Sequence, residues 1–215
     1  MPTSKINITN LEVMDWFKQQ PEKVDIWITD PPYHFSNKNG SGRMKFENGT
    51  DKMYSRMNYT DLEICYAEML KLSNQGAHCY IFTDRDGLFK TRPSLEAVGW
   101  QFRNVLVWDK VNLGMGYWWR NQVEYIVYCT NGKSKDYVTG APNIFRMKKP
   151  KGLSSKPPEI FESILQHQLR DGLVTADPFA GSDPLSKALN GNAGLLAKLG
   201  KSYSNIYTGE SIDVI

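Results

Sequence analysis

Two nearly uninterrupted runs of apolar residues constrain the fold more than any other feature of this sequence. Val24–Thr29 and Ala77–Thr83 are too short to be isolated helices and show no regular alternation of polar positions. Such runs are typical of strands that are covered on both faces, as in parallel sheets flanked by helices. The sequence therefore predicts an α/β protein.

Other β-rich segments alternate with helical patterns along all 215 residues. The seven predicted strands are Lys5–Thr9, Val24–Thr29, Ala77–Thr83, Phe102–Trp108, Val123–Cys129, Leu173–Ala176 and Asn205–Thr208. The predicted helices are Leu11–Gln19, Thr60–Leu72, Pro93–Val98, Pro158–Leu169 and Asp183–Leu199. Because Trp108–Val123 joins two strands without a long helix, we expect that pair to be antiparallel. The length and the lack of internal repeats predict a single domain over residues 1–215.

Positive charge is concentrated in two long polar loops, residues 34–59 and 130–156. The net charge of the whole chain is only +3, yet residues 34–59 and 133–155 together hold eleven Lys and Arg against three Asp and Glu. Concentrated positive charge on an otherwise acidic chain favours a polyanionic partner. Two solvated loops remain the alternative.

The cysteines and histidines show no metal-binding pattern. Cys65, Cys79 and Cys129 are odd in number and lie in apolar runs, so we expect reduced core residues and no metal. The sequence contains no signal peptide, lipidation motif or transmembrane run, which predicts a cytoplasmic protein without membrane contact.

The segment Asp30-Pro31-Pro32-Tyr33 directly follows the first apolar run. In open α/β sheets, ligands bind beyond the carboxyl ends of the strands. A carboxylate, a proline carbonyl and an aromatic face at such a point suit a flat base that carries an amino group. Asp30 and the Pro31 carbonyl can accept the two amino hydrogens, and Tyr33 can stack on the ring. An ordinary Asp-Pro turn is the alternative.

A second segment, Asp177-Pro178-Phe179-Ala180-Gly181-Ser182, lies between a predicted strand and a predicted helix. Small residues there allow close backbone approach to a ligand, and a helix N-terminus attracts an anionic group. Glu210 follows the last predicted strand, where an acid can bind ribose hydroxyls. Each signal is weak by itself.

Together, DPPY and DPFAGS resemble the motifs of the S-adenosylmethionine-dependent DNA amino-methyltransferases, which modify adenine N6 or cytosine N4. With DPPY first and FAGS late, the order is similar to that of the permuted beta class, and the resemblance covers nearly the whole chain. It implies a Rossmann-like, seven-stranded, mostly parallel sheet with one antiparallel hairpin strand, helices on both faces and a circularly permuted strand order. It also implies S-adenosylmethionine as the cofactor, DNA as the partner and a restriction-modification context.

The resemblance assigns roles to particular residues. The implied catalytic residues are Asp30, Pro31, Pro32 and Tyr33. The implied cofactor-binding residues are Asn10, Asp30, Lys156, Pro157, Asp177, Phe179, Ala180, Gly181, Ser182 and Glu210. The DNA-binding residues that we expect in the two loops are Lys38, Arg43, Lys45, Arg146, Lys148, Lys149 and Lys151. The acid at position 30 favours adenine N6 over cytosine N4.

Three positions depart from the family pattern. Asp183 stands where the family has a second glycine, and its charge would repel the cofactor's carboxylate unless it serves only as an N-cap. Asn10 replaces a usual acid, and the segment at 133–155 is short for a target-recognition region. The aromatic residues Tyr117, Trp118 and Trp119 can stack on a base, but we expect them in the core, because aromatics beside a strand are usually buried, and Tyr33 is the better stacking candidate.

Several alternatives stay open at this point. The same chemistry can act on cytosine N4, on an amine in RNA or on a glutamine side chain. The chain can also be a catalytically weak, nucleic-acid-binding subunit, as Asp183 and the short recognition region suggest. A homodimer is left open as well.

Overall fold

A computed structural model of the chain describes residues 5–20, 22–32, 57, 59–114, 117–134, 140–149, 156–168 and 170–207. Within these residues, eight strands form one sheet in the order β1-β8-β7-β2-β3-β5-β4-β6. The strands are β1 (Lys5–Thr9), β2 (Val24–Thr29), β3 (Ser73–Thr83), β4 (Gln101–Asp109), β5 (Val123–Thr130), β6 (Ile144–Arg146), β7 (Leu173–Asp177) and β8 (Leu199–Asn205).

The sheet is mostly parallel, as predicted. Of the eight described strands, only β5 runs antiparallel, and it pairs with both β3 and β4. The predicted count of seven strands is wrong, because β6 lies inside the segment 130–156 that was expected to be a loop. This strand has three residues and pairs parallel with the end of β4 at Val107–Asp109. A strand this short has no readable periodicity, and its pairing with β4 is a tertiary contact.

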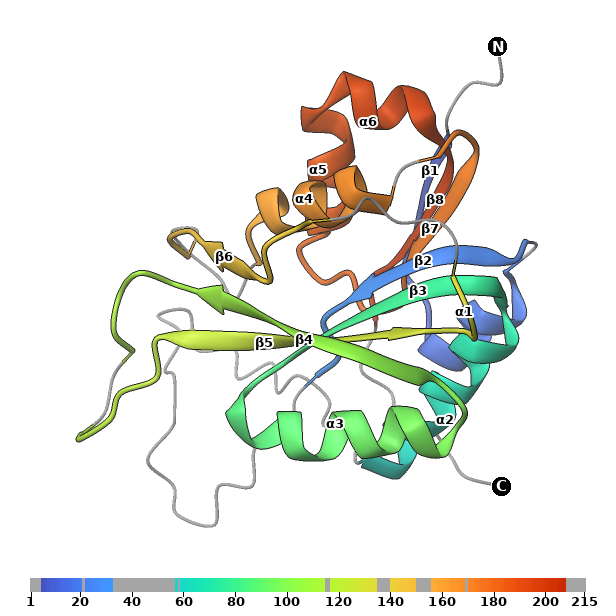
Figure 1. The fold of residues 1–215 in the computed structure, drawn as a ribbon. Helices are drawn as coiled ribbons and strands as arrows, with labels where there is room; N and C mark the ends of the chain where they lie inside the picture. Colours follow the sequence, from blue (N-terminus) through green and yellow to red (C-terminus); the bar gives the residue numbers. More distant parts are fainter. Residues whose placement is uncertain are drawn as a thin grey trace, which may run out of the picture.

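Helices cover both faces of the sheet (Figure 1). On one face lie α1 (Val13–Lys18), α2 (Tyr59–Lys71) and α3 (Arg85–Ala97), and on the other lie α4 (Pro158–Gln168), α5 (Pro184–Gly191) and α6 (Ala193–Lys198). Successive side chains of β2 point to opposite faces of the sheet. Trp27 packs in the core on the side of α1 and α2, whereas Ile26 and Ile28 pack in the core on the side of α4 and α5. The three cysteines are buried and unbridged, as expected.

Two helix predictions need correction. Helix α3 begins at Arg85, well before the predicted start at Pro93, because Asp84 caps it by accepting from the Gly87 backbone N–H at 2.7 Å. The predicted helix Asp183–Leu199 is divided at Asn192, whose extended backbone ends α5 and begins α6. The predicted strand Asn205–Thr208 is also wrong, because β8 is Leu199–Asn205 and Ile206 and Tyr207 lie beyond its end.

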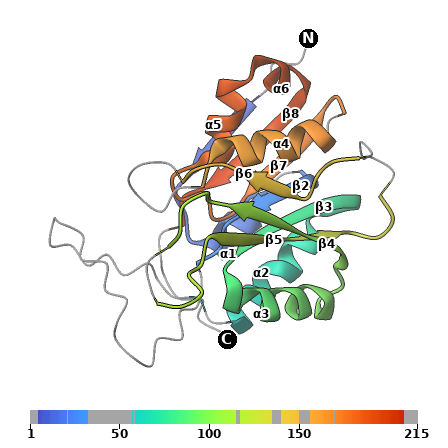
Figure 2. The ribbon, with the colours of Figure 1, turned by 60° about the vertical axis from the view of Figure 1, so that its left-hand side comes forward.

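The topology brings several segments to one edge. Parallel strands β1, β8, β7, β2 and β3 all end there, and the antiparallel strand β5 begins there. Figure 2 shows this arrangement from a second direction. Asp30 and the loop Asp177–Asp183 therefore lie at the carboxyl edge of the sheet, on neighbouring strands. No helix in the described part of the chain is both long and apolar enough to cross a membrane.

Candidate active site at the carboxyl edge of the sheet

Asp30 follows β2 and forms an ion pair with Lys156. The distance between Lys156 Nζ and Asp30 Oδ2 is 2.6 Å, and the Asp30 side chain is about one-quarter exposed (24%). Pro31 is buried and Pro32 is half-buried, so the two prolines fix the chain as it leaves the strand. Tyr33, the predicted stacking residue, lies outside the described residues.

Lys156 lies before α4 and is enclosed by two carboxylates and an aromatic ring. Its Nζ is 3.1 Å from Glu124 Oε2 on β5 and 5.6 Å from the centre of the Phe82 ring. Burial by itself would lower the pKa of Lys156, but the charges of Asp30 and Glu124 outweigh burial and raise it. The ammonium is therefore a permanent positive charge at the base of the site.

Glu124 extends this arrangement toward β4. Its other oxygen, Oε1, lies 3.2 Å from Lys110 Nζ. Burial would raise the pKa of Glu124, but Lys156 and Lys110 together lower it. Asp30, Lys156, Glu124 and Lys110 thus form a chain of alternating charges across the sheet edge. Sequence reasoning did not assign a role to Glu124 or Lys110, although an acid near the start of an apolar strand is a usable signal.

Asp177 joins the loop after β7 to the end of β2. Its buried carboxyl group accepts hydrogen bonds at Oδ1 from the Thr29 hydroxyl at 2.6 Å and from the Phe179 backbone N–H at 3.0 Å. Burial raises the pKa of Asp177 to about 8; these hydrogen bonds oppose the shift, whereas the charges of Asp183 and Asp30 add to it. The group is therefore mostly protonated at neutral pH and gives the loop its shape.

The loop from Phe179 to Ser182 is buried at its start and exposed at its tip. Phe179 and Ala180 are buried, and the Phe179 ring meets Tyr207 edge-on at 5.6 Å. Gly181 and Ser182 are exposed, and Gly181 has a φ of +53°, which a glycine adopts without strain. The exposed surface of this loop can be approached closely by a ligand.

Asn205, a residue that sequence reasoning missed, holds three strand ends together. Its side-chain Nδ2 donates to the Pro178 carbonyl at 3.1 Å, and its Oδ1 accepts from the Leu11 backbone N–H at 3.2 Å. Its own carbonyl accepts from the Ala180 N–H at 2.8 Å. Asn10 is exposed beside this junction. Glu210, the predicted ribose-binding acid, lies outside the described residues.

Asp183 adopts a left-handed backbone conformation, with φ +53° and ψ +61°. Its carboxylate accepts from the Ser186 N–H at 3.2 Å, so it caps α5, with Pro184 at the first turn as predicted. The carboxylate therefore lies at the N-terminus of α5 and accepts a hydrogen bond from a backbone N–H group that a bound anion would otherwise contact.

The basic residues expected to contact nucleic acid are partly described. Arg146 pairs with Asp109 at 3.0 Å and remains three-quarters exposed, whereas Lys148 and Lys149 are exposed just beyond β6. Pro157 is buried next to Lys156. The predicted residues Lys38, Arg43, Lys45 and Lys151 lie outside the described residues.

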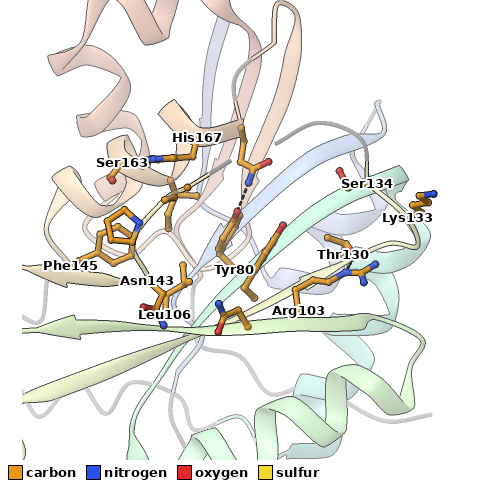
Figure 3. Close-up of a pocket in the computed structure, with 17 residues that line it drawn as sticks. Tyr80, Arg103, Leu106, Thr130, Lys133, Ser134, Asn143, Phe145, Ser163 and His167 are labelled. Atoms are coloured by element: carbon orange, nitrogen blue, oxygen red, sulfur yellow. Dashed lines mark hydrogen bonds between the residues drawn. The ribbon is translucent and has the colours of Figure 1, made fainter. Parts of the chain in front are cut away.

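A separate cavity of about 610 Å³ lies between α4 and the face of strands β3, β4 and β5 (Figure 3). It includes the stacked rings of Tyr80 and Tyr128, whose centres are 4.6 Å apart, and Gln168, which donates to the Tyr80 hydroxyl at 2.8 Å. None of the predicted catalytic or cofactor-binding residues lines it. This cavity is therefore distinct from the charged site at the sheet edge.

Comparison with known proteins shows a similarity to methyltransferases. No family model matches the chain. The type II methyltransferase M.HhaII of Haemophilus parahaemolyticus is 24% identical over 189 residues, which cover 78% of each chain. The resemblance to DNA methyltransferases inferred from the sequence motifs is supported by this relative, and the solved structures below share the fold.

Two solved structures share the fold over most of their length. M1.HpyAVI, in its complex with SAM, superposes with a TM-score of 0.68 and 18% identity over 93% of both chains. The cytosine-N4-specific PvuII DNA methyltransferase gives a TM-score of 0.65 and 10% identity over 96% of this chain and 83% of the other. The chain therefore has the mixed α/β methyltransferase fold.

Proposed function

We propose that this chain is a DNA methyltransferase that transfers a methyl group from S-adenosylmethionine to the exocyclic N6 of adenine. The observation that carries the proposal is the junction of its two motifs. Asp30 lies one residue beyond Thr29, and Thr29 is hydrogen-bonded to Asp177 at the start of the glycine loop. The residue that we assign to the target amine and the loop that we assign to the cofactor therefore lie at the same edge of the sheet.

The residues at this edge fit S-adenosylmethionine. The exposed tip at Gly181 and Ser182 and the exposed Asn10 amide offer polar groups at the ends of neighbouring strands. When bound, the cofactor supplies an electrophilic methyl group on a positively charged sulfur. We infer that Phe179, Ala180, Gly181, Ser182, Asn10, Pro157 and Glu210 hold it, and that Asp177 and Lys156 act by fixing the loop and Asp30.

Asp30 is the residue that we assign to the target amine. The lone pair of an exocyclic amine is delocalised into the base, so the nitrogen is a poor nucleophile. Hydrogen bonds from the amine to the Asp30 carboxylate and the Pro31 carbonyl localise that lone pair and stabilise the positive charge that grows on nitrogen. Lys156, at 2.6 Å, holds the Asp30 carboxylate in position. The surplus proton then leaves the nitrogen for solvent.

The target base has to leave the duplex to reach this edge, at a cost of a few kcal/mol. We infer that Tyr33 stacks on the extruded base and that Lys148, Lys149 and Arg146 contact phosphates. Lys38, Arg43, Lys45 and Lys151 complete the proposed DNA surface. On this proposal residues 1–215 form one catalytic domain in permuted order, and the enzyme works in the cytoplasm on cellular DNA.

The decisive experiment identifies the methylated product. Unmethylated DNA is incubated with the protein and isotope-labelled S-adenosylmethionine, digested to nucleosides and analysed by mass spectrometry, with Asp30→Ala as the inactive control. Labelled N6-methyladenine is expected. Labelled N4-methylcytosine would replace the adenine assignment by the cytosine activity printed for the structural neighbour.

Two further results would contradict the proposal more deeply. Label found only in an RNA substrate or in glutamine would overturn DNA as the substrate. Failure to bind S-adenosylmethionine in isothermal titration, together with DNA binding, would identify a nucleic-acid-binding subunit without catalytic activity.

A further inference from the structure

The loop between β4 and β5 presents three exposed aromatic side chains. Tyr117, Trp118 and Trp119 are 92%, 97% and 98% exposed, so the expectation that they are core residues is wrong. Isolated exposed apolar side chains are ordinary, but three consecutive large rings that are almost wholly in solvent indicate an interaction site. We call these three residues the aromatic tip.

The aromatic tip extends from the candidate active site itself. Lys110, one residue beyond β4, and Glu124, on β5, flank the loop and pair with each other at 3.2 Å. Glu124 in turn contacts Lys156, which contacts Asp30. Figure 1 shows the light-green loop projecting beyond the ends of β4 and β5, away from the covering helices. The aromatic tip thus lies beyond the same sheet edge as Asp30.

Hydrogen bonds give the described part of this loop a defined shape. Asp109 accepts from the Val111 N–H at 2.8 Å and from Gln122 Nε2 at 2.6 Å. Gly114 and Asn121 are joined across the loop by a backbone hydrogen bond of 2.9 Å. Trp118 has a φ of +56°, a backbone conformation that a bulky residue rarely adopts. The loop therefore holds its rings outward at some conformational cost.

The charges near the aromatic tip favour a polyanion. The loop and the adjoining β6 segment carry five cations, Lys110, Arg120, Arg146, Lys148 and Lys149, and two carboxylates, Asp109 and Glu124. Both carboxylates are already paired, Asp109 with Arg146 and Glu124 with Lys110 and Lys156. A partner that combines flat apolar faces with negative charge fits these rings and cations together.

We propose that the aromatic tip stacks on DNA bases next to the extruded target base. This inference rests on the proposed function and adds a base-contacting element to it. Extrusion leaves a gap in the base stack, and aromatic rings can fill such a gap by stacking on any base, because every base presents a π-face. The surrounding cations contact the phosphates on either side.

The distribution of tryptophans supplies a built-in reporter for this contact. Four of the six tryptophans are at most 2% exposed, namely Trp16, Trp27, Trp100 and Trp108. Acrylamide therefore quenches mainly Trp118 and Trp119 in the folded protein. A 30-base-pair duplex with one abasic site is expected to lower the fluorescence of these two tryptophans and to shield them from acrylamide. An undamaged duplex of the same sequence is expected to shield it less.

Variants then connect the shielding to affinity. Trp118→Ala/Trp119→Ala is expected to bind the fluorescein-labelled abasic duplex about 5- to 150-fold more weakly, as loss of one base-stacking contact predicts. Phe89→Ala is the matched control, because Phe89 is also exposed but lies on α3. Its affinity should stay within about twofold of the wild type.

Two outcomes would overturn the stacking proposal while leaving the proposed function intact. One is a double tryptophan variant that binds and methylates DNA like the wild type. The other is that, without DNA, shielding of the tryptophans from acrylamide increases with protein concentration and the wild type sediments as a dimer that the variant cannot form. That result would show that the rings contact a second copy of the chain. A wild-type protein without DNA binding or methyl transfer would instead contradict the proposed function.

Discussion

The hydroxyl of Thr29 donates a 2.6 Å hydrogen bond to Oδ1 of Asp177, although the two residues are 148 positions apart in the chain. Through this contact the end of β2, which leads into Asp30, and the loop after β7 are held as one unit. The bond lies in the buried interior of the sheet edge, where the protonation of Asp177 affects both motifs. The consequences can be tested on stability as well as on activity.

Asp177 is expected to make the protein less stable as the pH rises. Its pKa is about 8 in the folded protein and about 4 in an unfolded chain, so the folded state binds the extra proton between these values. Stability from this group is fully present below about pH 4 and is lost as the pH rises toward 8. Asp177→Asn, which mimics the protonated group, should therefore gain in melting temperature relative to wild type between pH 5 and 8.5. Asp86→Asn, an exposed acid with a lowered pKa, should show no such trend. A constant difference for Asp177→Asn would show that the carboxyl group is ionised throughout.

Lys156 is expected to be needed for stability because it separates two carboxylates. Lys156→Ala leaves Asp30 and Glu124 without their shared cation, and loss of one partner from such a buried group costs on the order of 3 kcal/mol. Urea denaturation of the variant measures this loss. Adding Glu124→Gln to Lys156→Ala should recover part of it, since one of the repelling charges is removed. Equal stability of the wild type and Lys156→Ala would contradict the role of the ion pairs.

Asp30→Ala is expected to abolish methyl transfer and to leave affinity for S-adenosylmethionine within a few fold. The reason is that Asp30 is assigned to the target amine, whereas the proposed cofactor residues lie mainly on the loops after β7 and β1. Product formation and isothermal titration measure the two properties separately. A variant that loses cofactor affinity but transfers methyl at the normal rate under saturation would reverse the assignment.

Asp183 is expected to weaken cofactor binding through its charge. Asp183→Asn keeps an N-cap for the Ser186 N–H and tolerates the left-handed backbone, so it removes the charge alone. Asp183→Gly removes the cap as well but suits the positive φ. Both variants should bind S-adenosylmethionine more tightly than the wild type, with only small changes in melting temperature. If neither binds more tightly, the carboxylate acts only on α5.

Lys148 and Lys149 are expected to contact DNA phosphates. Each contact contributes about 0.9 to the slope of log affinity against log salt concentration on duplex DNA, so Lys148→Gln/Lys149→Gln should flatten the slope by up to about 1.8. Lys23→Gln/Lys71→Gln makes the same change of charge before β2 and β3, at the opposite edge of the sheet, and serves as the control. Equal slopes for the two double variants would show that residues 148 and 149 form a solvated segment only.

The sequence predicted the sheet interior better than its periphery. Val24–Thr29 was recognised with its observed limits because complete burial leaves an apolar run, and the antiparallel pairing of β4 with β5 followed from the short connection. Strand β6 was missed because its pairing with β4 is not encoded in its own three residues. Helix α3 was predicted too short because Pro93, a residue common at the first helical turn, lies inside the helix.

The candidate site was predicted through its motifs, and its internal contacts were not. Asp30, Lys156 and the loop Asp177–Ser182 do meet at one edge, as the order of parallel strands requires. The partners Glu124 and Asn205 carry no motif, and their importance depends on distances that only the folded chain defines. The aromatic tip was wrongly expected in the core for a related reason, since the average burial of aromatic residues does not determine the exposure of one particular side chain.

The pairing of β1 with β8 also limits the order in which the strands of the sheet can form during folding. Thr9 and Asn205 contact each other across 196 positions, so β1 cannot pair with β8 until the ribosome has synthesised the residues that separate them. At a synthesis rate of about 5–20 residues per second, β1 waits roughly 10–40 s for that partner. Contacts of such long range form slowly. Amide hydrogens of β1 are therefore expected to gain protection after those of β2 and β3 in refolding experiments, and the junction at Asn205 is assembled among the last parts of the fold.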